Sequence, residues 1–205
     1  MLIAPEAVLD RLHDPRLRIC DVRWYLTEPG RGHRDYGQAH LPGAVFVDVD
    51  ADLVAPTGPG RHPLPAPTTF ARRMGELGIG LEHEVVVYDQ GGGTIVARLW
   101  WMLDAIGHPS VSLLDGGLGA WTAIGGPLEA TIPQHPPATL TPARSRWPNT
   151  IDREALAGSL GAVRVLDVRA AERYRGEVEP VDPVAGHIPT AVNLPTTGHL
   201  GAAGR

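Results

Sequence analysis

One motif occurs twice in this chain, and the copies are a whole domain apart. The first copy reads Ile-Cys-Asp-Val-Arg at residues 19–23 and Gly-Gln-Ala-His-Leu-Pro-Gly-Ala-Val at residues 37–45. The second copy reads Val-Leu-Asp-Val-Arg at residues 165–169 and Gly-His-Ile-Pro-Thr-Ala-Val at residues 186–192. Asp21 and Asp167 lie 146 positions apart (167 − 21). This spacing is far longer than a solenoid repeat, so it predicts a duplicated domain.

Length and charge narrow the class of protein. With 205 residues, 43% of them hydrophobic, the chain is long enough for one or two globular domains. The net charge of −5 argues against a nucleic-acid or membrane-surface partner. All 18 Lys and Arg positions are arginine, which excludes a Walker-type phosphate loop and a lysine Schiff base. The single cysteine, Cys20, excludes an intramolecular disulfide.

The sequence also carries no signal for secretion, membrane insertion or metal binding. No basic region precedes an apolar run at the N-terminus, and no apolar stretch approaches the length of a membrane span. No His-Glu-x-x-His motif or Cys/His cluster is present. We therefore expect a soluble cytoplasmic protein that contains no metal site.

Strand-like and helix-like segments alternate over the first 130 residues. We expect strands at residues 17–22, 44–49, 85–88 and 111–114, and helices at residues 5–12, 69–77 and 95–106. Thr68 or Thr69 is the expected N-cap of the second helix. Val85–Tyr88 is too apolar to have a wet face, so we expect it in the middle of the sheet. The alternation predicts an α/β fold with a mostly parallel sheet and helices on both faces.

Prolines mark the boundary between the two repeats. Residues 131–150 show little apolar periodicity and carry Pro133, Pro136, Pro137, Pro142 and Pro148, which favours an extended, semi-rigid linker. We therefore expect a complete first domain at residues 1–130 and an incomplete second domain at residues 151–205. In the second domain we expect a helix to residue 160 capped by Asp152, strands at 163–168 and 191–194, and a helical turn at 170–174.

The paired motifs resemble those of the tandem-domain rhodanese family, the thiosulfate and 3-mercaptopyruvate sulfurtransferases. Residues 115–121, which read Asp-Gly-Gly-Leu-Gly-Ala-Trp, add to this resemblance, and it covers the whole chain. It implies two rhodanese-like α/β domains joined by a linker. By this resemblance the first domain is non-catalytic, and the second carries a cysteine on the loop after its central strand.

The resemblance implies an enzyme that moves a sulfane sulfur from thiosulfate or 3-mercaptopyruvate to cyanide or a thiol. The sulfur is carried as a cysteine persulfide, and no cofactor is involved. Such a thiolate needs a lowered pKa and a cradle of backbone N–H groups, which a loop at a helix N-terminus supplies. The sequence of residues 85–106 predicts such a strand, loop and helix in the first domain. By this resemblance, Asp89 occupies the position that the cysteine has in a catalytic domain. A carboxylate at that position can cap the helix and cannot carry sulfur.

In the second domain, the strand and loop that would carry the cysteine lie beyond Arg205 by this resemblance. We therefore expect the chain to be truncated before the catalytic loop and inactive as given. Arg173, in Glu-Arg-Tyr-Arg-Gly, matches the family position whose arginine contacts the substrate anion. A guanidinium suits thiosulfate or a carboxylate, whereas the alternative interpretation is a solvated surface arginine.

The remaining notable residues have structural interpretations. We expect Cys20 to be a buried core residue. Arg23 and Arg169 are expected to form ion pairs inside their own domains, and His40 and His187 to hydrogen-bond the turns that contain them. The glycines at positions 91–93 are not followed by Lys-Ser/Thr, so a tight turn is favoured over phosphate binding.

Two other functions compete with the sulfurtransferase. The first is a rhodanese-like binding or regulatory module that has lost its chemistry. The second is a cysteine-based phosphatase or arsenate reductase, which requires a Cys-x5-Arg loop that this sequence does not contain. For the sulfurtransferase we expect only small-molecule partners: a sulfur donor and a cyanide or thiol acceptor, with no nucleic acid and no membrane.

Overall fold

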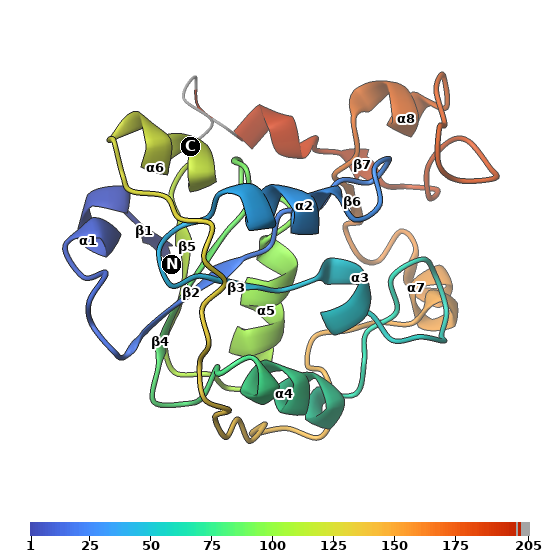
Figure 1. The fold of residues 1–205 in the computed structure, drawn as a ribbon. Helices are drawn as coiled ribbons and strands as arrows, with labels where there is room; N and C mark the ends of the chain where they lie inside the picture. Colours follow the sequence, from blue (N-terminus) through green and yellow to red (C-terminus); the bar gives the residue numbers. More distant parts are fainter. Residues whose placement is uncertain (200, 202–205) are drawn as a thin grey trace. The chain divides into compact units, whose positions relative to one another are not determined.

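The structure, a computed structural model, describes residues 1–199 and residue 201. The chain divides into two compact units, and each is described by itself. Unit 1 is Met1–Pro148, and unit 2 begins at Asn149 (Figure 1). No helix in the described residues is long and apolar enough to cross a bilayer.

Unit 1 is built on a sheet of five parallel strands in the order β1-β5-β4-β2-β3. Their bounds are β1 Leu2–Ile3, β2 Leu17–Asp21, β3 Val45–Phe46, β4 Glu84–Tyr88 and β5 Val111–Leu114. The central position of β4 confirms the prediction from its uniformly apolar sequence. Because every strand runs the same way, their carboxyl ends share one edge of the sheet, where α/β folds place binding sites.

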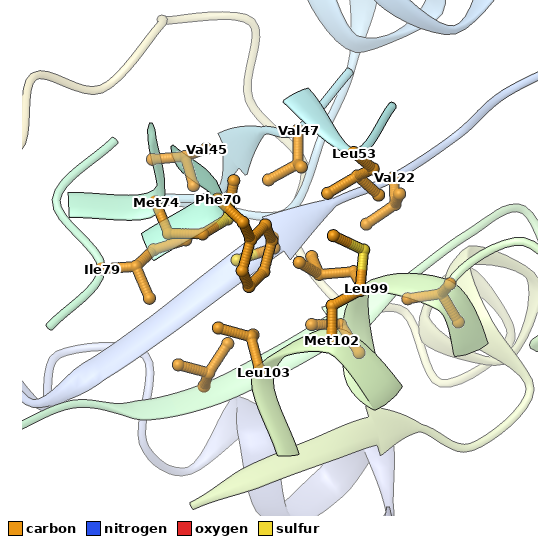
Figure 2. Close-up of a cluster of buried hydrophobic side chains, with 14 of the residues drawn as sticks. Val22, Val45, Val47, Leu53, Phe70, Met74, Ile79, Leu99, Met102 and Leu103 are labelled. Atoms are coloured by element: carbon orange, nitrogen blue, oxygen red, sulfur yellow. The ribbon is translucent and has the colours of Figure 1, made fainter. Parts of the chain in front are cut away.

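Helices cover both faces of this sheet, as the alternating sequence predicts. Their bounds are α1 Pro5–Leu9, α2 Arg31–Gln38, α3 Val49–Asp52, α4 Pro67–Glu76, α5 Ala97–Ala105 and α6 Gly117–Ala123. Successive residues of β4 point to opposite faces. Val85 and Val87 belong to a buried cluster with Phe70 of α4 and apolar residues of α5. Figure 2 shows Phe70 beside Leu99 and Leu103 of α5. Val86 contacts a second cluster that includes residues of α1 and α6.

Several boundaries differ from the sequence prediction. Helix α4 begins at Pro67, with Ala66 at the N-cap, so neither Thr68 nor Thr69 caps it. Proline suits the first helical position because its missing N–H would have no partner there. The strand expected at residues 44–49 is only Val45–Phe46, because Asp48 accepts hydrogen bonds from two following N–H groups and starts α3. Strand β1 and helices α2, α3 and α6 were not predicted as elements.

The proline-rich segment is extended, but up to Pro148 it belongs to unit 1. The Ala138 N–H donates to the Gly75 carbonyl, and Leu140 is buried in the core. A Cβ at Gly75 would sit 2.5 Å from the Ala138 carbonyl oxygen, so only glycine allows this approach. The Trp147 ring stacks on Trp101. Unit 1 therefore extends to Pro148, beyond the limit of residue 130 that composition indicates.

Unit 2 repeats the start of unit 1. It contains α7 Arg153–Ser159, β6 Leu166–Asp167, α8 Ala171–Arg175, β7 Val192–Asn193 and a 3-10 turn at Thr196–His199. Asp152 caps α7, as predicted. The parallel pairs Leu166–Val192 and Asp167–Asn193 match the pairs Cys20–Val45 and Asp21–Phe46 of unit 1. The strands expected at 163–168 and 191–194 are thus shortened to two residues each.

The two copies differ in how their strands are covered. Apolar strand residues of unit 2 are about half exposed: Leu166 49%, Val168 50% and Val192 51%. The equivalent residues of unit 1 are at most 7% exposed: Cys20, Val22 and Val45. In unit 1 the other edge of β2 pairs with β4 along its whole length, whereas β6 has no second strand neighbour among the described residues. The core that surrounds this motif in unit 1 is therefore not reproduced in the described part of unit 2.

A buried cationic cluster joins β2 to the proline-rich segment. The Arg18 guanidinium lies 2.8 Å from His83 Nε2 and 2.8 Å from His135 Nδ1. Burial and the Arg18 charge lower the pKa of His83. A protonated imidazole would place a second positive charge against the guanidinium, so this position favours the neutral form of His83.

This cluster predicts acid sensitivity of unit 1. Because His83 has a lower pKa in the folded state, the unfolded state binds more protons, and stability falls as the pH drops below the ordinary histidine pKa of about 6.5. The free energy of unfolding should therefore decrease from about pH 7 to about pH 5, and His83→Gln should make this decrease shallower. Urea titrations across this range test it, with the exposed His13→Gln as the control. Equal slopes for both variants would contradict the assignment.

Candidate functional site

The first copy of the motif forms a buried ion pair at the carboxyl end of β2. The Arg23 guanidinium donates to both carboxylate oxygens of Asp21, at 2.7–3.0 Å. Its Nη2 also donates to the Ala39 carbonyl, 2.7 Å away. On β4, the Tyr88 hydroxyl donates to the same carboxylate at 2.6 Å. The pair therefore joins two strands to the turn that contains His40.

The second copy forms the same ion pair. The Arg169 guanidinium donates to both oxygens of Asp167, at 2.6–3.2 Å, and to the Gly186 carbonyl, 2.6 Å away. The Arg169 amide also donates to Asp167, as the Arg23 amide does to Asp21. Both arginines are thus held inside their own units, as the sequence predicts.

Each copy also places a histidine against a tyrosine. His40 lies 2.7 Å from the Tyr36 carbonyl oxygen through Nδ1, and the two rings stack with centroids 4.1 Å apart. His187 makes the same contact with the Tyr174 carbonyl, and those rings stack at 3.8 Å. Both histidines therefore bond their turns, as expected. The match also identifies Tyr174 as the structural equivalent of Tyr36.

The loop after β4 is an anion cradle that the protein fills itself. Asp89 is 1% exposed, and its carboxylate accepts hydrogen bonds from the amides of four loop residues at 2.8–3.4 Å: Gly91, Gly93, Ile95 and Val96. The glycines reach the positive φ angles that bring these N–H groups together. The carboxylate caps the loop and the turn that precedes α5, so the cradle of unit 1 is closed to an external anion.

Cys20 is a core residue, as predicted. It lies on β2, it is 0% exposed, and burial raises the pKa of its thiol to about 12. A thiol with this pKa is almost entirely protonated at neutral pH, whereas the thiolate is the form that attacks sulfur. Burial in the core therefore disfavours the thiolate form of Cys20.

Arg173 belongs to a cluster of charges that only unit 2 contains. Its guanidinium donates to Glu179, at 2.7 and 3.3 Å, and to Asp182, at 3.0 Å. The corresponding position of unit 1, directly before the stacked tyrosine, is Asp35. The charge at this position is thus reversed between the copies. Arg173 is not the fully solvated arginine of the alternative interpretation, because its side chain is only 20% exposed.

Sequence reasoning missed Glu179 and Asp182. Both lie in a stretch between the two halves of the motif that has no counterpart in the first copy. The one available signal was the length of that stretch, because His187 follows Tyr174 by 13 positions and His40 follows Tyr36 by 4 (187 − 174 and 40 − 36). Among the described residues, no group of three or more His, Cys, Asp or Glu side chains is placed to hold a metal ion.

Comparison with known proteins decides the family. Residues 4–124 match the profile of the rhodanese-like domain. The chain belongs to the rhodanese family. One relative is a protein of Pseudomonas aeruginosa that is named a probable 3-mercaptopyruvate sulfurtransferase. It is 41% identical to this chain, and the match covers 100% of the chain and 74% of the relative. The human 3-mercaptopyruvate sulfurtransferase is 38% identical over 99% of the chain and 71% of the relative.

The fold agrees with this membership. The crystal structure of SseA from Escherichia coli, a 3-mercaptopyruvate sulfurtransferase, is similar along the whole chain, with a TM-score of 0.84 and 31% identity. The chain covers 78% of that structure. Its rhodanese-like α/β architecture, with a mostly parallel sheet, is therefore established, and its relatives are sulfurtransferases.

The cradle of unit 1 generates a stability prediction. Asp89→Ala leaves buried N–H groups without an acceptor, so it should lower the free energy of unfolding by about 1–3 kcal/mol. Asp89→Asn keeps one acceptor oxygen and should lower it less. Chemical denaturation measures both, and Asp104→Ala on the exposed side of α5 is the control. If Asp89→Ala is as stable as Asp104→Ala, the cap does not hold the loop.

Proposed function

We propose that this chain is the anion-binding part of a rhodanese-type sulfurtransferase. The reaction moves a sulfane sulfur from thiosulfate or 3-mercaptopyruvate to cyanide or a thiol, through a cysteine persulfide. In this proposal unit 1 is the non-catalytic domain, and unit 2 is the first part of the catalytic-type domain. The sulfurtransferases among its relatives support the reaction class.

The observation that carries the proposal is the charge reversal before the stacked tyrosine. Unit 1 has the carboxylate of Asp35 there, and it fills its own cradle with the buried carboxylate of Asp89. Unit 2 has Arg173 at the same point of the same motif. A guanidinium is the side chain best suited to the oxyanion of thiosulfate or the carboxylate of 3-mercaptopyruvate. Arg173 is therefore the proposed substrate-binding residue.

The 205 residues do not include a suitable nucleophile. The sequence has one cysteine, and Cys20 is buried with a raised pKa. We propose that the chain by itself binds the donor anion without turning it over. The alternative function, a catalytically dead rhodanese-like binding or regulatory module, shares this absence of a thiolate. It differs in having no requirement for a thiosulfate site at Arg173.

Thiosulfate binding tests the proposal. Arg173→Ala should weaken binding of thiosulfate by about 1.5–3 kcal/mol, the scale of a hydrogen bond to a charged group. Arg175→Ala, two positions away and 53% exposed, carries the same charge change and should leave binding nearly unchanged. Chemical-shift titration of the labelled chain with thiosulfate measures both. Equal weakening by the two variants would assign the effect to net charge and would remove Arg173 from the site.

An activity assay tests the absence of a nucleophile. The chain, incubated with thiosulfate and cyanide, should form no thiocyanate above the rate without protein, because a buried thiol with a high pKa is a poor nucleophile. Turnover that Cys20→Ser abolishes would show that Cys20 is reactive and would overturn this part of the proposal.

A further inference from the structure

The segment between Tyr174 and His187 is nine residues longer than its counterpart between Tyr36 and His40 (13 − 4). Unit 1 forms the same ion pair and the same tyrosine–histidine stack without those nine residues. The insertion is therefore not needed to build the motif. Its charged residues must be explained by something that only the second copy does.

The most enclosed charge of the insertion is Glu179, whose side chain is 6% exposed. Its Oε1 accepts from Arg173 Nη2 at 2.7 Å and from the amides of Val181 and Asp182 at 3.0 and 2.9 Å. Its Oε2 lies 3.3 Å from Arg173 Nε. The two Glu179 oxygens thus engage the Nε–Nη2 edge of the guanidinium together, a bidentate arrangement that fixes its orientation.

Glu179 also connects Arg173 to the rigid part of the motif. Its Oε2 lies 3.4 Å from Arg169 Nη1, and Arg169 is itself held by Asp167. The backbone amides and the Arg173 guanidinium together lower the pKa of Glu179 to about 2, so the carboxylate is charged at neutral pH. Arg173 is therefore joined to the end of β6 through a continuous series of ion pairs.

One edge of Arg173 remains open. Its Nη1 has no hydrogen-bond partner among the described residues. No buried side-chain nitrogen or oxygen in that part of the chain lacks a partner, so Nη1 is accessible to solvent. An oxyanion can approach this nitrogen without displacing Glu179.

We infer that Glu179 is a positioning residue for Arg173: it holds the Nε–Nη2 edge so that Nη1 is presented to the donor oxyanion. This inference rests on the proposed anion site. An arginine loses conformational freedom when it binds, and a guanidinium already fixed by a bidentate partner loses less. Glu179 thus raises anion affinity although it carries a negative charge.

Asp182 has the opposite effect on the same guanidinium. It accepts from Arg173 Nη2, which Glu179 already holds, and its side chain is 41% exposed at the edge of the cluster. It therefore adds repulsion toward an anion and little further orientation. We therefore expect opposite effects on thiosulfate affinity. Removing the charge of Glu179 weakens thiosulfate binding, and removing the charge of Asp182 strengthens it.

The experiment titrates thiosulfate into the isotope-labelled chain and into its Glu179→Gln, Asp182→Asn and Glu177→Gln variants. Glu177 lies in the same insertion, is exposed and pairs with Arg175, so Glu177→Gln matches the charge change away from the site. We expect Glu179→Gln to weaken binding by about tenfold, the lower end for a charged hydrogen bond. Asp182→Asn should strengthen it severalfold, and Glu177→Gln should match the wild type.

A second measurement needs no variant and reads the arginine directly. In the wild-type chain, thiosulfate should shift the Nη1 proton signals of Arg173 and leave its Nε proton signal in place. A shift or loss of the Nε signal would show that the anion replaces Glu179 and would overturn the inference. This measurement holds even if Glu179→Gln destabilises unit 2.

The outcomes separate the two proposals. If Arg173→Ala abolishes binding and Glu179→Gln binds as tightly as the wild type or more tightly, the anion site stands and the positioning role is wrong. If the wild-type chain does not bind thiosulfate, or Arg173→Ala binds it equally well, the proposed anion site fails and this inference fails with it.

Discussion

Both units depend on an aspartate and an arginine two residues apart at the carboxyl end of a strand. The carboxylate accepts from the arginine side chain and backbone, and the guanidinium reaches a carbonyl of the following turn. Such a pair is held in one orientation because the carboxylate engages the Nε–Nη2 edge of the guanidinium with both of its oxygens. In unit 1 the carboxylate is 0% exposed and also receives the Tyr88 hydroxyl, so the pair is sealed by the neighbouring strand. In unit 2 the same pair stands at a more exposed position, with 27% of the Arg169 side chain accessible.

The two copies of this Asp–Arg pair are surrounded by different charged groups. In unit 1 two charged side chains bond groups of the same unit. Asp89 accepts hydrogen bonds from the loop after β4, and the Arg18 guanidinium contacts the imidazoles of His83 and His135. These contacts stabilise a closed domain and offer no anion site. In unit 2 Glu179 accepts hydrogen bonds from both Arg169 and Arg173. The Nη1 atom of Arg173 has no hydrogen-bond partner among the described residues. In the proposed function, one copy therefore serves stability, and the other copy presents Arg173 to a charged ligand.

Local sequence was sufficient for features whose partners are near in the chain. The Asp-x-Arg spacing predicted both ion pairs, the apolar run of β4 predicted its central position, and Asp152 predicted the start of α7. Features set by distant partners were not visible. The strand expected at 163–168 is short because, among the described residues, only the two-residue strand β7 pairs with it. The segment after residue 130 belongs to unit 1 because Gly75 allows the close approach of Ala138. The positioning role proposed for Glu179 depends on two arginines that the fold brings together, and no propensity or periodicity in the sequence marks it.

The most direct test compares one hydrogen bond that occurs in both copies. The Val47 amide donates to the Asp21 carbonyl at 2.9 Å, and the Leu194 amide donates to the Asp167 carbonyl at 2.8 Å. The two hydrogen bonds occupy equivalent positions beside the Asp–Arg pair of their own unit. Their surroundings differ, because Val47 is 0% exposed and Leu194 is 39% exposed. Native-state hydrogen exchange, in which protection follows local stability, should find the Leu194 amide exchanging roughly a hundredfold faster or more. Equal protection of the two amides would contradict the view that the same motif is enclosed by a core in unit 1 and left uncovered in unit 2.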